Sequence, residues 1–322
     1  MYYFYNRGGE MMALIGNRYE ILANIDSIEL NTLYKARDVY NNTKVLIKII
    51  EHEENIHEDF VSNLIDESTN IDGIKSHYIM KILEVGVHCT EDTTLYYIVS
   101  EYCGGIGLDK IISGNYLHLE AIISIATQIL RSLEVAHAHN LYHGDLKPSN
   151  IIVDKWYNIK ISDFGVTKAN NGVNLRLNNN ISYLCPHQLN INYTDIESDL
   201  FALGLILYEC IFKKLPFEKG ATENEMLKFI DKGVNWNEVK GVNGNDELIN
   251  IIKKLLSRTN KYANISDIIV DLSAIMYDKA DIEEEIVADI EESKNSKLIS
   301  SRKFLLGTAI IALISFMVVS NL

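Results

Sequence analysis

Two short motifs contain polar residues that could act together in a catalytic site. The first, His-Gly-Asp-Leu-Lys-Pro-Ser-Asn, supplies Asp145, Lys147 and Asn150, and the second, Asp-Phe-Gly, begins at Asp163. Phosphoryl transfer needs a carboxylate that orients the attacking hydroxyl, oxygen ligands for Mg²⁺, and positive charge near the phosphates. Asp145 could orient the hydroxyl, while Asn150 and Asp163 could bind Mg²⁺. Lys147 could supply the nearby positive charge.

The first part of the chain has the pattern of a small β-sheet. Runs rich in Ile, Val, Leu and Tyr alternate with turn residues, and Asn41-Asn42 is typical of a hairpin turn. The strands that this pattern predicts are 19–25, 32–38, 44–50, 79–88 and 95–101. One stretch of helical character, 58–71, interrupts them. An antiparallel sheet with a single helix is therefore expected here.

After residue 108 the pattern becomes helical. Apolar residues recur at helical spacing and form one stripe, which consists of Ile122, Ile125, Ala126, Ile129, Leu130, Leu133 and Ala136. Residues 200–212 are apolar nearly all round but too few to span a bilayer, which predicts a helix buried in a large domain. Helical spacing resumes at 224–233 and 247–257. The β-rich and α-rich parts would join near residues 103–105.

These motifs, in this order and at this spacing, resemble the eukaryotic-type Ser/Thr protein kinase family from residue 18 to about residue 275. The resemblance implies an α+β fold, the two-lobed protein kinase-like fold. The small antiparallel β lobe with one helix would be residues 18–102, and the larger α-helical lobe would be residues 103–277. Residues 1–17 would be an N-terminal extension.

The resemblance also implies the roles of the motif residues. Asp145 and Lys147 would be catalytic, and Asn150 and Asp163 would bind Mg²⁺. Asp199 resembles the aspartate that braces the catalytic loop from below. A lysine two residues after the catalytic aspartate is the Ser/Thr-kinase form of this loop. The implied reaction is transfer of the ATP γ-phosphate to Ser or Thr of protein substrates, with ATP and Mg²⁺ as cofactors.

A second set of residues resembles the family's nucleotide site. Lys48 ends a strand-like Val-Leu-Ile-Lys run, and Glu67 falls where the family has a glutamate on its helix. The resemblance implies that these two form the ion pair that holds the α- and β-phosphates. The other residues of the implied ATP-binding set are Glu101 and Cys103 at the hinge, and Ile25 and Leu33.

The glycine-rich loop of the family is missing from this chain. Asp26, Ile28 and Asn31 stand at the three glycine positions, where side chains would keep the backbone away from the phosphates. At about 6 Å and an effective dielectric of about 20, Asp26 would repel a phosphate charge by at most about 3 kcal/mol. Leu46 replaces the alanine that lies against adenine. Weak ATP binding is therefore expected.

The segment after Asp163 also departs from the family pattern. Gly144 stands where most relatives have an arginine that pairs with a phosphorylated residue. His187 and Ala263 stand where the family has a glutamate and an arginine that form a buried pair. Breaking one side of such a pair costs about 3–5 kcal/mol, whereas losing both can be nearly neutral. The double replacement indicates a compensated loss.

Three functions remain open on these observations. The retained Lys48, Asp145 and Asp163 favour an active protein kinase. The missing glycines and the altered segment favour the alternative, a pseudokinase that serves as a membrane-tethered binding or signalling scaffold. A kinase-fold enzyme acting on small molecules is disfavoured, because the resemblance to protein kinases continues throughout the helical lobe.

The composition of the chain indicates which binding partners, which redox compartment and which metal sites are compatible with it. The 322-residue chain has a formal net charge of -14, which argues against nucleic-acid binding because a binder needs a basic surface. Its four cysteines, without a CxxC pair, fit a reducing compartment. His137 and His139 form a close pair but have no third metal ligand at suitable spacing.

The end of the chain has the pattern of a membrane anchor. Residues 278–303 form an acidic juxtamembrane linker, for which a solvated helix and a docking segment are both open. Residues 304–322 carry no charge and would reach about 28 Å as a helix, against a hydrocarbon core of about 30 Å. A buried core helix is the alternative, but the segment lacks a polar face. Arg302 and Lys303 precede it, so we expect a single-pass C-terminal anchor inserted after synthesis, with the kinase domain cytoplasmic.

Overall fold

The structure is a computed structural model that describes residues 14–26, 31–51, 56–89, 94–114, 117–176, 180–217, 222–236 and 246–277. Contacts divide the chain into a first unit, residues 1–272, and a second unit from residue 273 onward. The β-sheet and the candidate site belong to the first unit. The expected linker 278–303 and membrane helix 304–322 lie outside the described residues. No helix in the described part of the chain has the length and hydrophobicity needed to cross a membrane.

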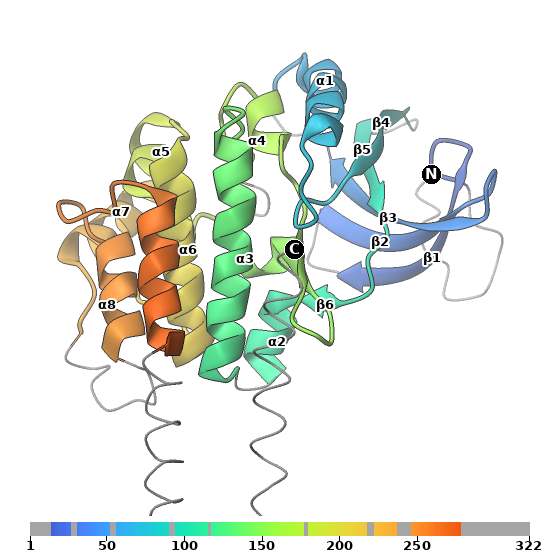
Figure 1. The fold of residues 1–322 in the computed structure, drawn as a ribbon. Coiled ribbons are helices and arrows are strands. Elements are labelled where there is room, and N and C mark those ends of the chain that lie inside the picture. The colour runs from blue at the N-terminus through green and yellow to red at the C-terminus, as the bar shows by residue number, and fades with distance from the viewer. Residues whose placement is uncertain are drawn as a thin grey trace, which may run out of the picture. The chain divides into compact units, whose positions relative to one another are not determined.

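The N-terminal lobe is a five-stranded antiparallel sheet with the strand order β1-β2-β3-β5-β4 (Figure 1). Its strands are β1 (Tyr19–Asp26), β2 (Asn31–Asp38), β3 (Thr43–Glu51), β4 (Ile82–Cys89) and β5 (Thr94–Glu101). Asn42 takes a left-handed φ of 58°, as the predicted hairpin turn between β2 and β3 requires. The antiparallel sheet and its single helix confirm the prediction for this lobe.

Both faces of the central strand β3 are buried, which explains its unbroken apolar run. Ile47 and Ile49 pack in one apolar cluster with residues of β1, β2 and β5. Ile50 packs on the other side against Phe60 and Leu64 of α1 (Phe60–Gly73). The single helix of the lobe is therefore fixed to the sheet by its apolar side, which determines where Glu67 can reach.

The C-terminal lobe is mainly helical. Its helices are α2 (Leu108–Gly114), α3 (Leu119–His137), α4 (Val166–Ala169), α5 (Pro186–Ile191), α6 (Ile196–Phe212), α7 (Glu223–Lys232) and α8 (Asp246–Leu255). Residues 265–277 are also helical. A small antiparallel sheet of β6 (Ile106–Gly107), β7 (Ile151–Val153) and β8 (Ile159–Ile161) lies beside them, and a 3₁₀ turn, η1 (Pro148–Asn150), precedes β7.

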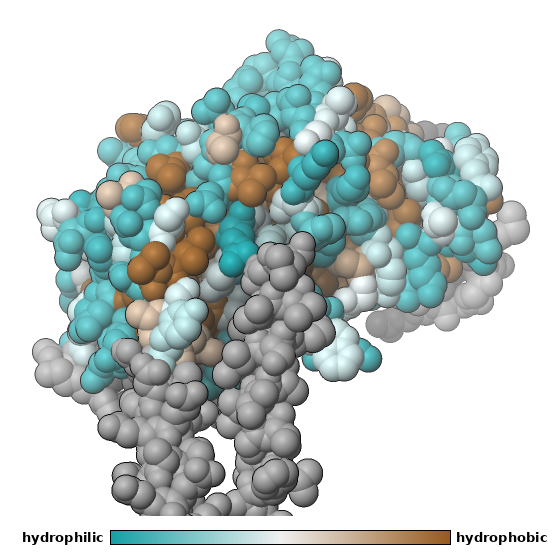
Figure 2. Space-filling model, in the orientation of Figure 1, coloured by the Kyte–Doolittle hydropathy of each residue, from teal (hydrophilic) through white to brown (hydrophobic). Residues whose placement is uncertain are grey.

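The two long helices α3 and α6 form the centre of this lobe and lie side by side (Figure 1). The predicted apolar stripe of α3 is buried along its whole length, from Ile122 to Ala136. Helix α6 is buried nearly all round, as its sequence predicts, and Asp195 caps its N-terminus by accepting the Ser198 N–H at 3.1 Å. Hydrophilic residues cover most of the face in Figure 2, including α1.

Candidate functional site

The loop that carries Asp145 is braced from below by α6. The Asp199 carboxylate, fully buried, accepts the backbone N–H groups of His143 at 2.9 Å and Gly144 at 2.8 Å. It also lies 2.8 Å from Nε2 of His137, at the end of α3. These contacts confirm the bracing position predicted for Asp199. Two backbone hydrogen bonds to one carboxylate, which His137 also contacts, fix the backbone immediately before Asp145.

Asp145, Lys147 and Asn150 meet within this loop. Nζ of Lys147 lies 2.6 Å from the Asp145 carboxylate. The Asn150 side-chain amide donates to the Asp145 carbonyl at 2.9 Å and reaches its carboxylate at 3.4 Å. Burial alone would raise the pKa of Asp145, but Lys147, Lys48 and an Asn174 hydrogen bond together outweigh it, so the pKa lies below its usual value. Asp145 is therefore an ionised hydrogen-bond acceptor at neutral pH.

Lys48 of β3 forms an ion pair with Asp163, which follows β8. Burial would lower the pKa of Lys48, but the Asp163 charge outweighs burial and the pKa is raised. Asp163 takes a left-handed φ of 65°, and its carboxylate contacts Lys48 of the sheet lobe. This brings a cation and a carboxylate from the two lobes together beside Asp145.

The predicted pair between Lys48 and Glu67 is wrong for this conformation. Glu67 lies 2.9 Å from Nζ of Lys168 in α4, while Lys48 pairs with Asp163. Helix α1 packs against α4, so Lys168 is the cation within reach of Glu67. Each carboxylate is thus satisfied by one lysine, and Lys168 is a residue of this network that the sequence did not point to.

The remaining residues of the predicted nucleotide set lie around the hinge and the first strands. Leu33 pairs with Lys48 across β2 and β3, and Ile25 on β1 is about half exposed. The Glu101 carboxylate contacts Nζ of Lys160 at 2.6 Å, so its side chain is engaged within the protein. Burial raises the pKa of the Cys103 thiol to about 11, which keeps it neutral at physiological pH.

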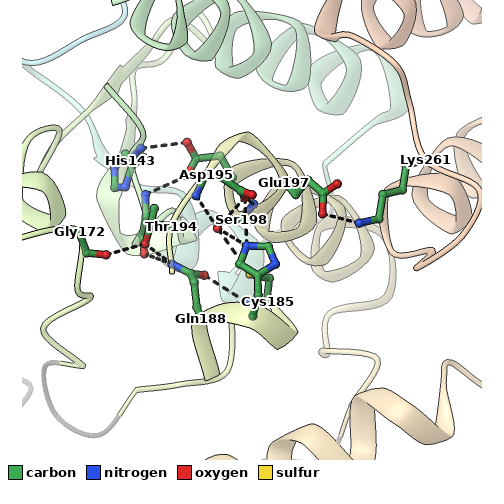
Figure 3. Close-up of polar contacts among 12 residues, drawn as sticks. His143, Gly172, Cys185, Gln188, Thr194, Asp195, Glu197, Ser198 and Lys261 are labelled. Atoms are coloured by element: carbon green, nitrogen blue, oxygen red, sulfur yellow. Dashed lines mark hydrogen bonds and ion pairs between the residues drawn. The ribbon is translucent and has the colours of Figure 1, made fainter. Parts of the chain in front are cut away.

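His187 and Ala263 stand at the positions of the family's buried glutamate and arginine. Both line a cavity of about 430 Å³. His187 instead contacts Asp195 at 3.0 Å and Ser198 at 2.9 Å at the start of α6. Figure 3 shows the contact between Asp195 and Ser198 together with the ion pair between Glu197 and Lys261. Although His187, Asp195 and Glu197 have ligand atoms within 4.8 Å of one another, capping and ion pairing already account for their positions.

Comparison with known proteins agrees with this geometry. The family model for the protein kinase domain matches residues 20–264. A probable serine/threonine-protein kinase of Clostridium perfringens is 32% identical over 82% of this chain and 39% of its own length. The serine/threonine-protein kinase PrkC of Bacillus subtilis is 30% identical over 67% of this chain and 34% of its own length. The chain thus spans less than half the length of these curated relatives.

Among solved structures, Rad53 residues 1–466 in complex with AMP-PNP has the same fold. The TM-score is 0.62 with 21% sequence identity, and the match covers 79% of this chain and 64% of that chain. The two-lobed kinase-like fold expected from the sequence is thereby confirmed. On its motifs, its fold and the family model, the chain belongs to the protein kinase domain family, in its eukaryotic-type serine/threonine form.

Proposed function

We propose that the chain transfers the γ-phosphate of ATP to Ser or Thr hydroxyls of protein substrates. The observation that carries this proposal is the convergence of Lys48, Asp145, Lys147 and Asp163 at one place between β3, β8 and the loop after α3. Charges withdrawn from water are costly unless they pair or have a function, and these four largely buried charges come from three separate segments.

In the proposed reaction, the ionised Asp145 accepts the hydrogen bond of the substrate hydroxyl and orients its oxygen toward the γ-phosphate. Lys147, 2.6 Å from that carboxylate, places positive charge beside the transferred group. The Asn150 amide nitrogen is occupied by the Asp145 carbonyl, which leaves its oxygen for a metal, and Asp163 offers a carboxylate. Both are the hard oxygen ligands that suit Mg²⁺, which when bound would neutralise phosphate charge.

The proposal is tested with the full chain, Mg²⁺, γ-labelled ATP and a mixture of unstructured protein substrates. We expect labelled phosphate on Ser or Thr of the substrates. When EDTA removes Mg²⁺, no label should be transferred. Calorimetry with ATP runs alongside. Nucleotide binding without any transfer would instead support the pseudokinase scaffold, and neither binding nor transfer would reject both functions.

Restoring the loop glycines should strengthen ATP binding. This prediction rests on the sequence, because residues 27–30 lie outside the described residues. Asp26→Gly with Ile28→Gly removes a negative charge and a side chain from the phosphate approach, so we expect about ten-fold tighter Mg²⁺-ATP binding, or about 1.4 kcal/mol. Isothermal calorimetry measures it. The control is Asn42→Gly, at a turn that already has φ of 58°; binding no tighter than in this control would refute the steric argument.

Removing Lys168 should release Glu67 toward Lys48. In Lys168→Ala we expect the KM for ATP to fall by up to about five-fold, because a partly exposed ion pair is worth about 1 kcal/mol or less. The matched control is Lys81→Ala, which breaks a different pair on the same helix α1, with Asp72 at 2.6 Å. Equal KM values for the two variants would show that the Glu67–Lys168 pair does not limit nucleotide binding.

We also propose that residues 304–322 anchor the chain in a membrane with the kinase domain on the cytoplasmic side. Their support is an uncharged stretch of nearly spanning length preceded by Arg302 and Lys303. The full chain should pellet with membranes and resist carbonate extraction, whereas deletion of this segment should release it. Ile311→Lys with Ile314→Lys should also release it, since each charge costs about 3 kcal/mol at the bilayer centre. A full chain that stays in the supernatant without detergent would refute the anchor.

A further inference from the structure

The carbonyl of Gly144, next to the catalytic Asp145, accepts two side-chain amides. Nδ2 of Asn174 donates to it at 2.7 Å and Nε2 of Gln188 at 2.8 Å. Both amide residues are buried, at 4% and 3% exposure. They lie on either side of residues 175–187, so one carbonyl ties both ends of this stretch to the catalytic loop. We call these two bonds the amide bridge.

Further contacts hold the amide bridge in place. Oγ1 of Thr194 accepts from the Gln188 amide at 3.3 Å and donates to the Gly172 carbonyl at 2.9 Å, as Figure 3 shows. Arg176 donates to the Asn174 carbonyl at 3.1 Å and to the Gln188 carbonyl at 3.0 Å. The backbone of each amide residue is therefore tied to the other through one guanidinium group.

No side chain fits at Gly144. Its φ is 71°, and an added Cβ would lie 2.7 Å from Cγ2 of Thr167 and 2.8 Å from Cγ2 of Thr194. An arginine here would need both threonines to move. The Ser and Thr residues between Asp163 and His187 are Thr167 and Ser182, which are only 2% and 7% exposed. A phosphate on either would have to enter a packed interior, so the space of an arginine–phosphate contact is already filled by neutral groups.

We propose that Asn174 and Gln188 are positioning residues that orient Asp145 through the Gly144 carbonyl, without a phosphorylated residue in this segment. The proposal rests on the proposed function. Asn174 acts through this carbonyl, which directly precedes Asp145 in the chain. Neutral amides suit this place because the nearby cations Lys48 and Lys147 are already paired with Asp163 and Asp145.

The test uses Asn174→Asp and Gln188→Glu in the full chain. Each variant keeps the shape of the side chain and replaces its NH₂ donor with an oxygen that repels the Gly144 carbonyl. The matched control is Gln128→Glu, because Nε2 of Gln128 donates to the Tyr157 carbonyl at 2.8 Å in the same lobe but outside the site. A merely structural amide should behave as this control does.

We expect kcat to fall about ten- to a hundred-fold in each bridge variant, as misplacement of a reacting group does, with the KM for ATP within about two-fold of wild type. Gln128→Glu should keep its kcat. Phosphatase treatment of the wild type should leave kcat unchanged. Bridge variants with the kcat of the control, or a wild type inactivated by phosphatase, would overturn the proposal.

Hydrogen exchange separates this proposal from the proposed function. In both bridge variants the peptides covering Gly144 and Asn174 should lose protection, while Gln128→Glu should retain it there. This readout needs no turnover. A wild type that transfers no phosphate would refute the proposed function, yet loss of protection in the variants would still support the bridge. Unchanged protection would overturn the bridge whatever the activity.

Discussion

Asp145→Asn is expected to lower the rate of phosphate transfer by about 10²–10⁴-fold, the usual contribution of a positioned acid–base group. The amide can still hydrogen-bond with its neighbours, but it loses the negative charge that accepts the substrate hydroxyl's hydrogen bond. The substitution also removes the negative charge that pairs with Lys147, 2.6 Å away. The initial rate of label transfer under saturating Mg²⁺-ATP measures the effect.

The control for this prediction is Asp154→Asn. Asp154 is also an aspartate of the helical lobe, but its carboxylate accepts backbone N–H groups of a surface turn, at 2.8 and 2.9 Å. It should keep the wild-type rate. Calorimetry should find that Asp145→Asn still binds ATP, because Lys48 and Asp163 are unchanged. If Asp145→Asn transferred phosphate as fast as Asp154→Asn, the role given to Asp145 would be wrong.

Asp199→Ala is expected to lower the free energy of unfolding by about 3–5 kcal/mol. The fully buried carboxylate accepts two backbone N–H groups and contacts His137, and alanine offers none of them an acceptor. Each buried donor left unsatisfied costs about 1–3 kcal/mol. Urea unfolding followed by circular dichroism measures the change.

Asp154→Ala serves as the comparison for stability. It removes two backbone hydrogen bonds of similar length, but at a turn where water can replace the lost acceptor. The expected loss is about 1 kcal/mol. Similar losses in the two alanine variants would show that burial of Asp199 is not what stabilises the loop.

How far the site could be predicted depends on the separation of its residues along the chain. Asp145, Lys147 and Asn150 lie within one loop, so their spacing alone predicts that they meet, and they do. Similarly, the burial of α3 along one stripe and of α6 nearly all round is a consequence of local apolar patterns. Such features depend on backbone geometry over a few residues.

Ion pairs between distant segments could not be predicted in the same way. Lys48 has two acidic candidates, Glu67 and Asp163, and the sequence favours the first by resemblance. Which one it meets depends on how α1 packs against the sheet and α4, and on the competing Lys168. The packing energy of many apolar side chains outweighs that of one partly exposed pair.

The replacement of the family's buried Glu–Arg pair shows both what the sequence can predict and what it cannot. Sequence comparison with the family pattern assigns His187 and Ala263 to its two positions, and both line one cavity. It did not indicate that His187 would contact the cap of α6, nor that Asn174 and Gln188 would share the Gly144 carbonyl. Asparagine and glutamine are common and form no distinctive motif. Their role depends on the three-dimensional fold, because a hydrogen bond requires donor and acceptor within about 3 Å, and folding brings these distant residues that close.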